Sequence, residues 1–183
     1  MTGRLPAWAE VAPERVAHVE RVAALAAGWA ERMRVSEAER ERWLRAVWLH
    51  DALRDADAAS LDRWAPDSPG PGGLRHGPAC AARAEAEGEA DRGVLDAVRY
   101  HSVGWAGWGA VGRALYCADY LEPGRAFDRE RRAELASRFP DDPSGVLRAV
   151  AADRLTHVIG SGWLLLEPTV RFWNSLVEPS ASA

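Results

Sequence analysis

The chain has 183 residues, of which 48 % are hydrophobic, and this length and composition suit one folded domain with a sizeable core. Its formal net charge of −4 argues against binding to a nucleic acid polymer or to an anionic membrane surface. The sequence contains no recognisable signal segment, no apolar run of about 18 residues and only two cysteines, so we expect a cytoplasmic protein without a membrane anchor or a disulfide framework.

The first half of the chain is expected to be helical, because alanine, leucine, arginine and glutamate are abundant and period-two alternation is absent. A first helix is predicted to begin near Pro13, a residue favoured in the first turn of a helix. A second is predicted to begin at a capping box that starts with Ser36 and to end near His50. The stretch 65–73, rich in proline and glycine, predicts a loop that is either a mobile flap or a passive connector.

The second half is also predicted to be helical, with helices that begin near Pro78, Asp91, Val111, Asp128 and Pro143. The last of these is expected to run to about Leu166, where Glu167-Pro168 breaks it, and a short helix then ends near Leu176. We therefore predict an all-α fold, with a single helical bundle over residues 1–177 and a flexible C-terminal tail at 178–183.

Four of the five histidines form an ordered series with two aspartates, and each member lies in a helical, apolar context. Imidazole and carboxylate groups suit Fe, Mn, Zn or Co, and two such ions about 3.5–4 Å apart can hold one hydroxide and clamp a phosphate. The last aspartate shares a face with apolar residues, where an unpaired carboxylate would be costly and a metal would remove that cost. We therefore expect one or two divalent transition metal ions, with the ligands His18, His50, Asp51, His76, His101 and Asp119.

The order His, His-Asp, His, His, Asp resembles that of the HD-domain metal-dependent phosphohydrolases. The segments around these residues resemble, more narrowly, the bacterial YqeK-type family of symmetrical bis(5'-nucleosyl)-tetraphosphatases. Its most specific match is the segment 118–125, which reads Ala-Asp-Tyr-Leu-Glu-Pro-Gly-Arg, and the resemblance covers roughly residues 12–176. It implies that the bundle is a single HD domain and that the chain is an enzyme.

The resemblance implies that the enzyme cleaves diadenosine tetraphosphate into two ADP through a metal-activated hydroxide. Iron is the metal expected from the family, with manganese, cobalt or zinc as alternatives. The tighter metal is expected on His18, His50, Asp51 and Asp119, with Asp51 as the bridging ligand. His76 and His101 then either complete a second metal site or face the phosphates of the substrate.

The catalytic residues implied by the resemblance are Asp51, which bridges the metals, and Arg54 and Arg125, which clamp phosphates. For Arg54 the alternative is a solvated cation at a helix end. Arg15 is expected either to support a metal ligand or to form a surface ion pair. The segment Trp163–Leu166 is expected either to approach the nucleotide or to belong to the core. The substrate contacts are therefore expected to be His76, His101, Ser102, Arg125, Trp163, Leu164, Leu165 and Leu166.

Two residues depart from the family pattern. Arg54 stands where the family usually has lysine, and the positive charge is kept with a different geometry. Trp105 stands where the family usually has arginine, and its ring could instead stack on a base. This loss of a cation favours an alternative function, an HD phosphohydrolase of another small nucleotide. A catalytically silent nucleotide-binding module is a further alternative, and a homodimer is possible.

Overall fold

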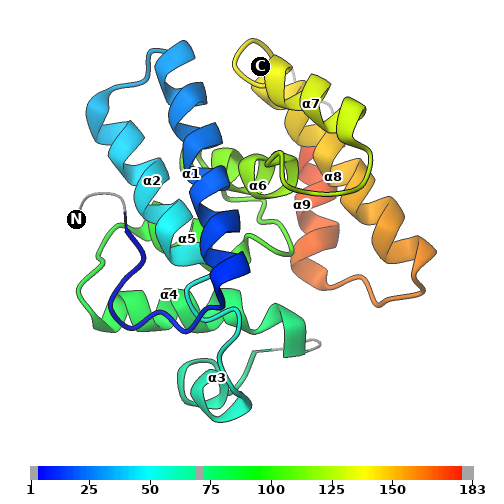
Figure 1. Ribbon diagram of the computed structural model, residues 1–183. Helices are drawn as coiled ribbons and strands as arrows, with labels where there is room; N and C mark the ends of the chain where they lie inside the picture. The colour runs from blue at the N-terminus through cyan, green and yellow to red at the C-terminus, as the bar shows by residue number, and fades with distance from the viewer. Residues whose placement is uncertain (1–3, 69–71, 179–183) are drawn as a thin grey trace.

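The computed structural model describes residues 4–68 and 72–178, and the regular elements in these ranges are all helices (Figure 1). They are α1 (Pro13–Arg32), α2 (Glu37–His50), α3 (Ala58–Trp64), a 3₁₀ turn (Gly72–Leu74), α4 (His76–Ala86), α5 (Arg92–Tyr100), α6 (Ala110–Leu121), α7 (Arg129–Arg138), α8 (Pro143–Gly160) and α9 (Glu167–Val177). The all-α prediction is confirmed. Of the tail predicted at 178–183, all but the first residue lies outside the described residues.

Helices α1, α2, α4, α5 and α6 form one bundle, in which α2 contacts each of the other four (Figure 1). Helices α7, α8 and α9 gather beside this bundle, and α7 and α8 both pack on α6. The core between the helices is apolar, and Val22, Val47, Val98 and Ala118 are at most 1 % exposed. No helix in the described ranges is both long enough and apolar enough to cross a membrane.

Local sequence signals set several helix starts. The Ser36 hydroxyl accepts a hydrogen bond from the backbone N–H of Glu39, as the predicted capping box requires. The Glu39 side chain accepts from the indole of Trp43 instead of completing the box. The Asp91 carboxylate caps α5 as predicted, and Asp57 caps α3, a short helix that the sequence analysis did not predict.

The long helix predicted to reach Leu166 ends six residues earlier, at Gly160. Gly162 has a φ of +68°, a left-handed conformation that glycine adopts readily and that ends a helix. Residues 163–166 have no regular secondary structure, and Leu166 instead serves as the N-cap of α9. The prediction for this segment was therefore wrong, and its side chains are placed by a turn and not by a helix.

Gly77 allows two helices to meet closely at the future site. A Cβ atom at this position would lie 2.9 Å from the backbone oxygen of Arg99, 3.1 Å from that of Val98 and 3.3 Å from Cε1 of His101. The absent side chain therefore lets the start of α4, which carries His76, approach the end of α5, which carries His101.

Replacing Gly77 with alanine should lower the free energy of unfolding by about 1–3 kcal/mol, because a methyl group there meets rigid backbone atoms. It should also weaken metal binding by shifting His101. Gly28→Ala is the matched control, since a Cβ there meets nothing within 4 Å and alanine is the better helix former. Urea denaturation and elemental analysis of the three proteins test this, and a Gly77→Ala protein as stable and as metal-rich as the wild type would contradict it.

Candidate metal centre

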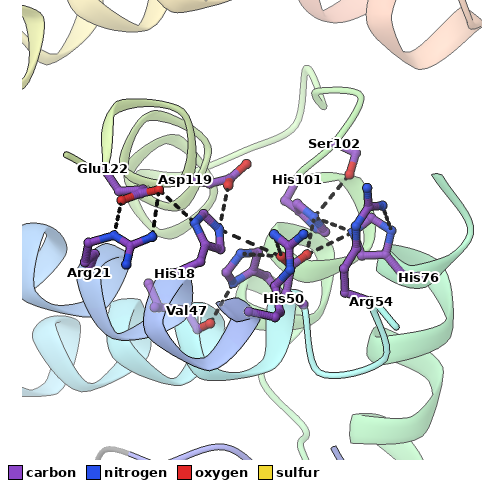
Figure 2. A network of polar contacts seen from close by, with 12 residues as sticks. His18, Arg21, Val47, His50, Arg54, His76, His101, Ser102, Asp119 and Glu122 are labelled. Atoms are coloured by element: carbon purple, nitrogen blue, oxygen red, sulfur yellow. Dashed lines mark hydrogen bonds and ion pairs between the residues drawn. The ribbon is translucent and has the colours of Figure 1, made fainter. Parts of the chain in front are cut away.

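The six predicted ligands lie together, and they come from five different helices or helix ends (Figure 2 labels all but Asp51). His18 lies on α1, His50 and Asp51 at the C-terminal end of α2, and His76 at the start of α4. His101 directly follows α5, and Asp119 lies in the last turn of α6. All six side chains belong to residues that are at most 7 % exposed.

Asp51 is the centre of the arrangement. Its Oδ1 atom lies 3.0 Å from Nε2 of His76 and 3.5 Å from Nε2 of His101. Its Oδ2 atom lies 3.7 Å from Nε2 of His50 and 3.8 Å from Nε2 of His18. Two triads of ligand atoms therefore share this carboxylate, and the three atoms of each triad lie within 4.8 Å of one another.

The other ring nitrogen of each of the four histidines faces an oxygen acceptor. Nδ1 of His50 lies 2.7 Å from the carbonyl oxygen of Val47, and Nδ1 of His101 lies 2.7 Å from that of Val98. Nδ1 of His76 lies 3.0 Å from the carbonyl oxygen of Gly73, and Nδ1 of His18 lies 3.1 Å from a carboxylate oxygen of Glu122. An Nδ1–H that donates to these oxygens leaves Nε2 unprotonated and aimed at Asp51, the tautomer that binds metals.

Helix ends explain two of these contacts. The last four carbonyls of an α-helix have no partner within the helix. Val47 and Val98 are in the last turns of α2 and α5, and the histidine that lies at the end of each helix donates to them. Each helix end therefore orients its own histidine ring.

The electrostatic state of the site also suits metal binding. Burial lowers the pKa of His50 to about 4 and lowers the pKa of His76 as well, so both rings are neutral near pH 7. Burial by itself would raise the pKa of the Asp51 carboxyl, but the adjacent histidines, His50 first and then His101 and His76, hold that pKa well below its usual range. The site thus presents the neutral imidazoles of His50 and His76 beside an ionised carboxylate.

These donors need a cation. The Nε2 atoms of His18 and His50 are buried without a hydrogen-bond partner in the described part of the chain, and each such atom costs about 1–3 kcal/mol. The Nε2 atoms of His76 and His101 lie only 3.0 Å apart, and in the tautomer set by Nδ1 both present lone pairs. A divalent ion among these nitrogens and carboxylate oxygens would satisfy all of them, and the donor set fits Fe, Mn, Co or Zn.

Asp119 lies beside the two triads rather than inside one. Its Oδ1 atom is 3.1 Å from Nε2 of His18. It also accepts from Arg125 at Oδ1 and from Arg154 at Oδ2, both at 2.8 Å. Burial opposes ionisation of Asp119, but His18 and Arg154 keep its pKa well below the usual range. Asp119 is therefore a charged carboxylate adjacent to one triad.

The arginines named from the sequence also reach the centre. Arg54 lies 3.0 Å from Nδ1 of His76 and donates to the carbonyl of Gly73, so it is more than a solvated helix-end cation. Arg15 donates to Oδ2 of Asp51 at 3.0 Å, which favours the supporting role over a surface ion pair.

Two residues in the centre were given no role by the sequence analysis. Glu122, which is 1 % exposed, accepts from Arg21 and faces His18. Glu122 follows Asp119 by three residues, at the C-cap of α6, and this spacing could have indicated that the two lie on the same side. Arg154 comes from α8, and nothing local in the sequence connects it with the histidines. His157, in contrast, is exposed, packs on Trp163 and belongs to neither ligand triad.

A cavity of about 590 Å³ adjoins the centre through Ser102 and Arg154. The Ser102 hydroxyl lies 3.1 Å from Nε2 of His101. All four residues of the segment 163–166 line this cavity. Trp163 and Leu164 are 61 % and 82 % exposed, so the alternative that they belong to the core is wrong.

Trp105 does not line this cavity. Its ring is stacked on Tyr100, with ring centroids 4.4 Å apart and an interplanar angle of 9°. One of its faces is therefore already covered within the protein.

Two curated proteins are similar to part of this chain. Two curated relatives are both named symmetrical bis(5'-nucleosyl)-tetraphosphatase. The one from Bacillus subtilis (strain 168) is 44 % identical over 55 residues, 30 % of each chain. The one from Staphylococcus aureus (strain NCTC 8325 / PS 47) is 45 % identical over 53 residues, 28 % of this chain and 27 % of the relative. The matched segments thus span less than a third of either relative.

A solved structure and a family model extend the likeness over more of the chain. The structure is of a protein from Clostridium acetobutylicum described as a predicted HD superfamily hydrolase involved in NAD metabolism. It has a TM-score of 0.76 at 23 % identity and covers 91 % of this chain and 90 % of its own, which shows a shared fold. The family model of the HD domain matches residues 15–139. The chain therefore belongs to the HD-domain family.

Proposed function

We propose that this chain is a metal-dependent phosphohydrolase that cleaves diadenosine tetraphosphate symmetrically into two ADP. The observation that carries the proposal is the pair of ligand triads that share the carboxylate of Asp51. The choice of substrate is supported by the names of the two curated relatives and by the segment 118–125.

The metal in this proposal is a divalent transition ion, with iron favoured by the family resemblance and manganese, cobalt or zinc as alternatives. His18, His50 and Asp51 would hold one ion, with Asp119 beside them, and Asp51, His76 and His101 would hold another. When bound, such ions acidify water and so provide a hydroxide nucleophile near neutral pH.

The protein supplies the positive charge that a polyphosphate needs. Five arginines contact residues of the centre, namely Arg15, Arg21, Arg54, Arg125 and Arg154. Three carboxylates lie among these arginines, namely those of Asp51, Asp119 and Glu122. The centre thus has an excess of cationic side chains within a chain of net charge −4. Fixed guanidinium groups around a water-poor site stabilise the charge that develops during phosphoryl transfer.

The order of the contacts suggests where cleavage occurs. Figure 2 shows a row that runs from Glu122 through His18 and His50 to His101 and His76. Arg54 contacts the His76 end, whereas Arg125 contacts Asp119 at the His18 end. A tetraphosphate laid along this row would meet an arginine at each end and place its middle near Asp51, which favours symmetric cleavage.

The adjacent cavity offers a place for a nucleoside. Its lining includes the aromatic residues Tyr116, Phe172 and Trp173, together with Ser102 and the segment 163–166. Cavities of a few hundred Å³ with mostly apolar linings and a few polar groups are typical small-molecule sites. The proposal therefore keeps Ser102 and Trp163–Leu166 as substrate contacts.

Trp105 supports a second candidate, hydrolysis of another small nucleotide. Its ring is stacked on Tyr100 and does not line the cavity, so it does not replace the missing family arginine with a base contact there. A shorter phosphate chain would need fewer cations. A catalytically silent module has less support, since all six ligand residues are present and converge. A homodimer stays a prediction.

The protein should retain a transition metal when it is purified without added metal. The double variant His50→Ala/Asp51→Ala should lose both the metal and the hydrolytic activity, because it removes the shared carboxylate and one imidazole. His157→Ala is the control for metal content, since that histidine belongs to neither ligand triad and should leave the bound metal unchanged. Elemental analysis measures the metal content of each protein. Full metal occupancy in the double variant would show that the ligands are misassigned.

Diadenosine tetraphosphate should give ADP as the only nucleotide product, because the proposed phosphate row is centred on Asp51. Separation of the products by anion-exchange chromatography measures this. Equal amounts of ATP and AMP would mean asymmetric cleavage and would contradict the proposed register. Faster turnover of another small nucleotide would favour the second candidate.

A further inference from the structure

Arg154 of α8 occupies the boundary between the metal centre and the adjoining cavity. It donates to Oδ2 of Asp119 at 2.8 Å. Its guanidinium carbon lies 4.3 Å from the ring centroid of Tyr116 and 5.3 Å from that of Tyr120. The side chain is 20 % exposed. Two aromatic rings and a carboxylate therefore hold this cation in a fixed position at the edge of the cavity.

Arg154 is also the one arginine among the described residues that line this cavity. The only carboxylate in the lining, Asp153, is occupied, because it accepts two hydrogen bonds from Arg131. The other lining residues are mostly apolar or aromatic. An anionic group that enters the cavity beside the metal centre would therefore meet a single positive charge, that of Arg154.

The Arg154 guanidinium has donors to spare. A guanidinium group carries five N–H bonds, and Arg154 makes one hydrogen bond to the described residues, through a single terminal nitrogen. Its Nε atom is buried without a partner. The carboxylate of Asp119 is shared with Arg125, so it does not neutralise both cations. An additional anion would satisfy the remaining charge.

We propose that Arg154 is a phosphate-binding residue that contacts the phosphate next to the nucleoside held in the cavity. The inference rests on the proposed function in taking the anion to be part of a nucleotide. It assigns Arg154 to one half of the substrate, at the junction of nucleoside and phosphate. Arg125 donates to the same carboxylate, that of Asp119, so Arg154 would act beside Arg125 at that end of the phosphate row.

A purely structural role predicts a different behaviour. If Arg154 only positioned Asp119, its loss would disturb the centre and lower the metal content. It would also affect every ligand in the same proportion, with or without a phosphate. A phosphate-binding role instead weakens the binding of ADP while the metal content and the binding of adenosine stay unchanged.

The test uses the full-length, metal-loaded protein and the variants Arg154→Gln, Arg154→Lys and Arg148→Gln. Arg148 is exposed on the same helix and serves as the matched control. Isothermal titration calorimetry measures the affinities for ADP and for adenosine, and elemental analysis measures the metal. Arg154→Gln should weaken ADP binding about 10- to 100-fold, as expected for a lost charge-assisted hydrogen bond, with adenosine binding and metal content unchanged. Arg148→Gln should match the wild type.

Arg154→Lys keeps the charge but loses the planar donor pair, so it should recover only part of the ADP affinity. Wild-type ADP affinity in Arg154→Gln would overturn the inference, as would a parallel loss of metal, or no ADP binding by the wild type. If Arg154→Gln does not fold, as judged by circular dichroism, Arg154→Lys decides alone. Unchanged ADP affinity in that variant would then overturn the inference.

The same proteins separate this inference from the proposed function. If the wild type does not hydrolyse diadenosine tetraphosphate, the proposed function is wrong. The comparison of ADP with adenosine would still decide the role of Arg154, since it requires binding and no turnover.

Discussion

The buried carboxylate of Asp51 is the constraint on which the rest of the site depends. It is 4 % exposed and lies among four imidazole rings. An isolated charge at such a depth would be expensive. Arg15 offsets part of that cost, because it donates a hydrogen bond to one oxygen of the carboxylate. A centre that concentrates acceptor atoms in this way favours a bound cation, which would satisfy them.

Helix ends place and orient most of the imidazole rings around Asp51. The C-terminal ends of α2 and α5 each offer a carbonyl to the histidine at that end, and the start of α4 brings His76 against these histidines. The close approach of α4 to α5 depends on the missing side chain of Gly77. The carboxylate of Glu122 faces Nδ1 of His18 and so orients this ring, as the backbone carbonyls orient the other three histidine rings. The backbone, more than any side chain, thus determines which nitrogen faces Asp51.

Much of this could be predicted from the sequence, because the relevant signals are local. Proline and capping residues marked the starts of α1, α2 and α5, and helical periodicity placed His18 and Asp119 on inner faces. The end of α8 was not predicted, because the left-handed turn at Gly162 interrupts an otherwise apolar, helix-like stretch. Arg154 was missed for a different reason. Its contact with Asp119 joins residues 35 positions apart and depends on the packing of α8 against α6.

The proposed function requires metal ions bound around the shared carboxylate of Asp51. Anomalous diffraction from crystals of the protein purified without added metal, collected at the absorption edges of iron, manganese, cobalt and zinc, tests this directly. We expect two peaks about 3.5–4 Å apart, with one carboxylate oxygen of Asp51 facing each. A peak distant from Asp51, or a histidine cluster with no bound metal after metal loading, would contradict the account.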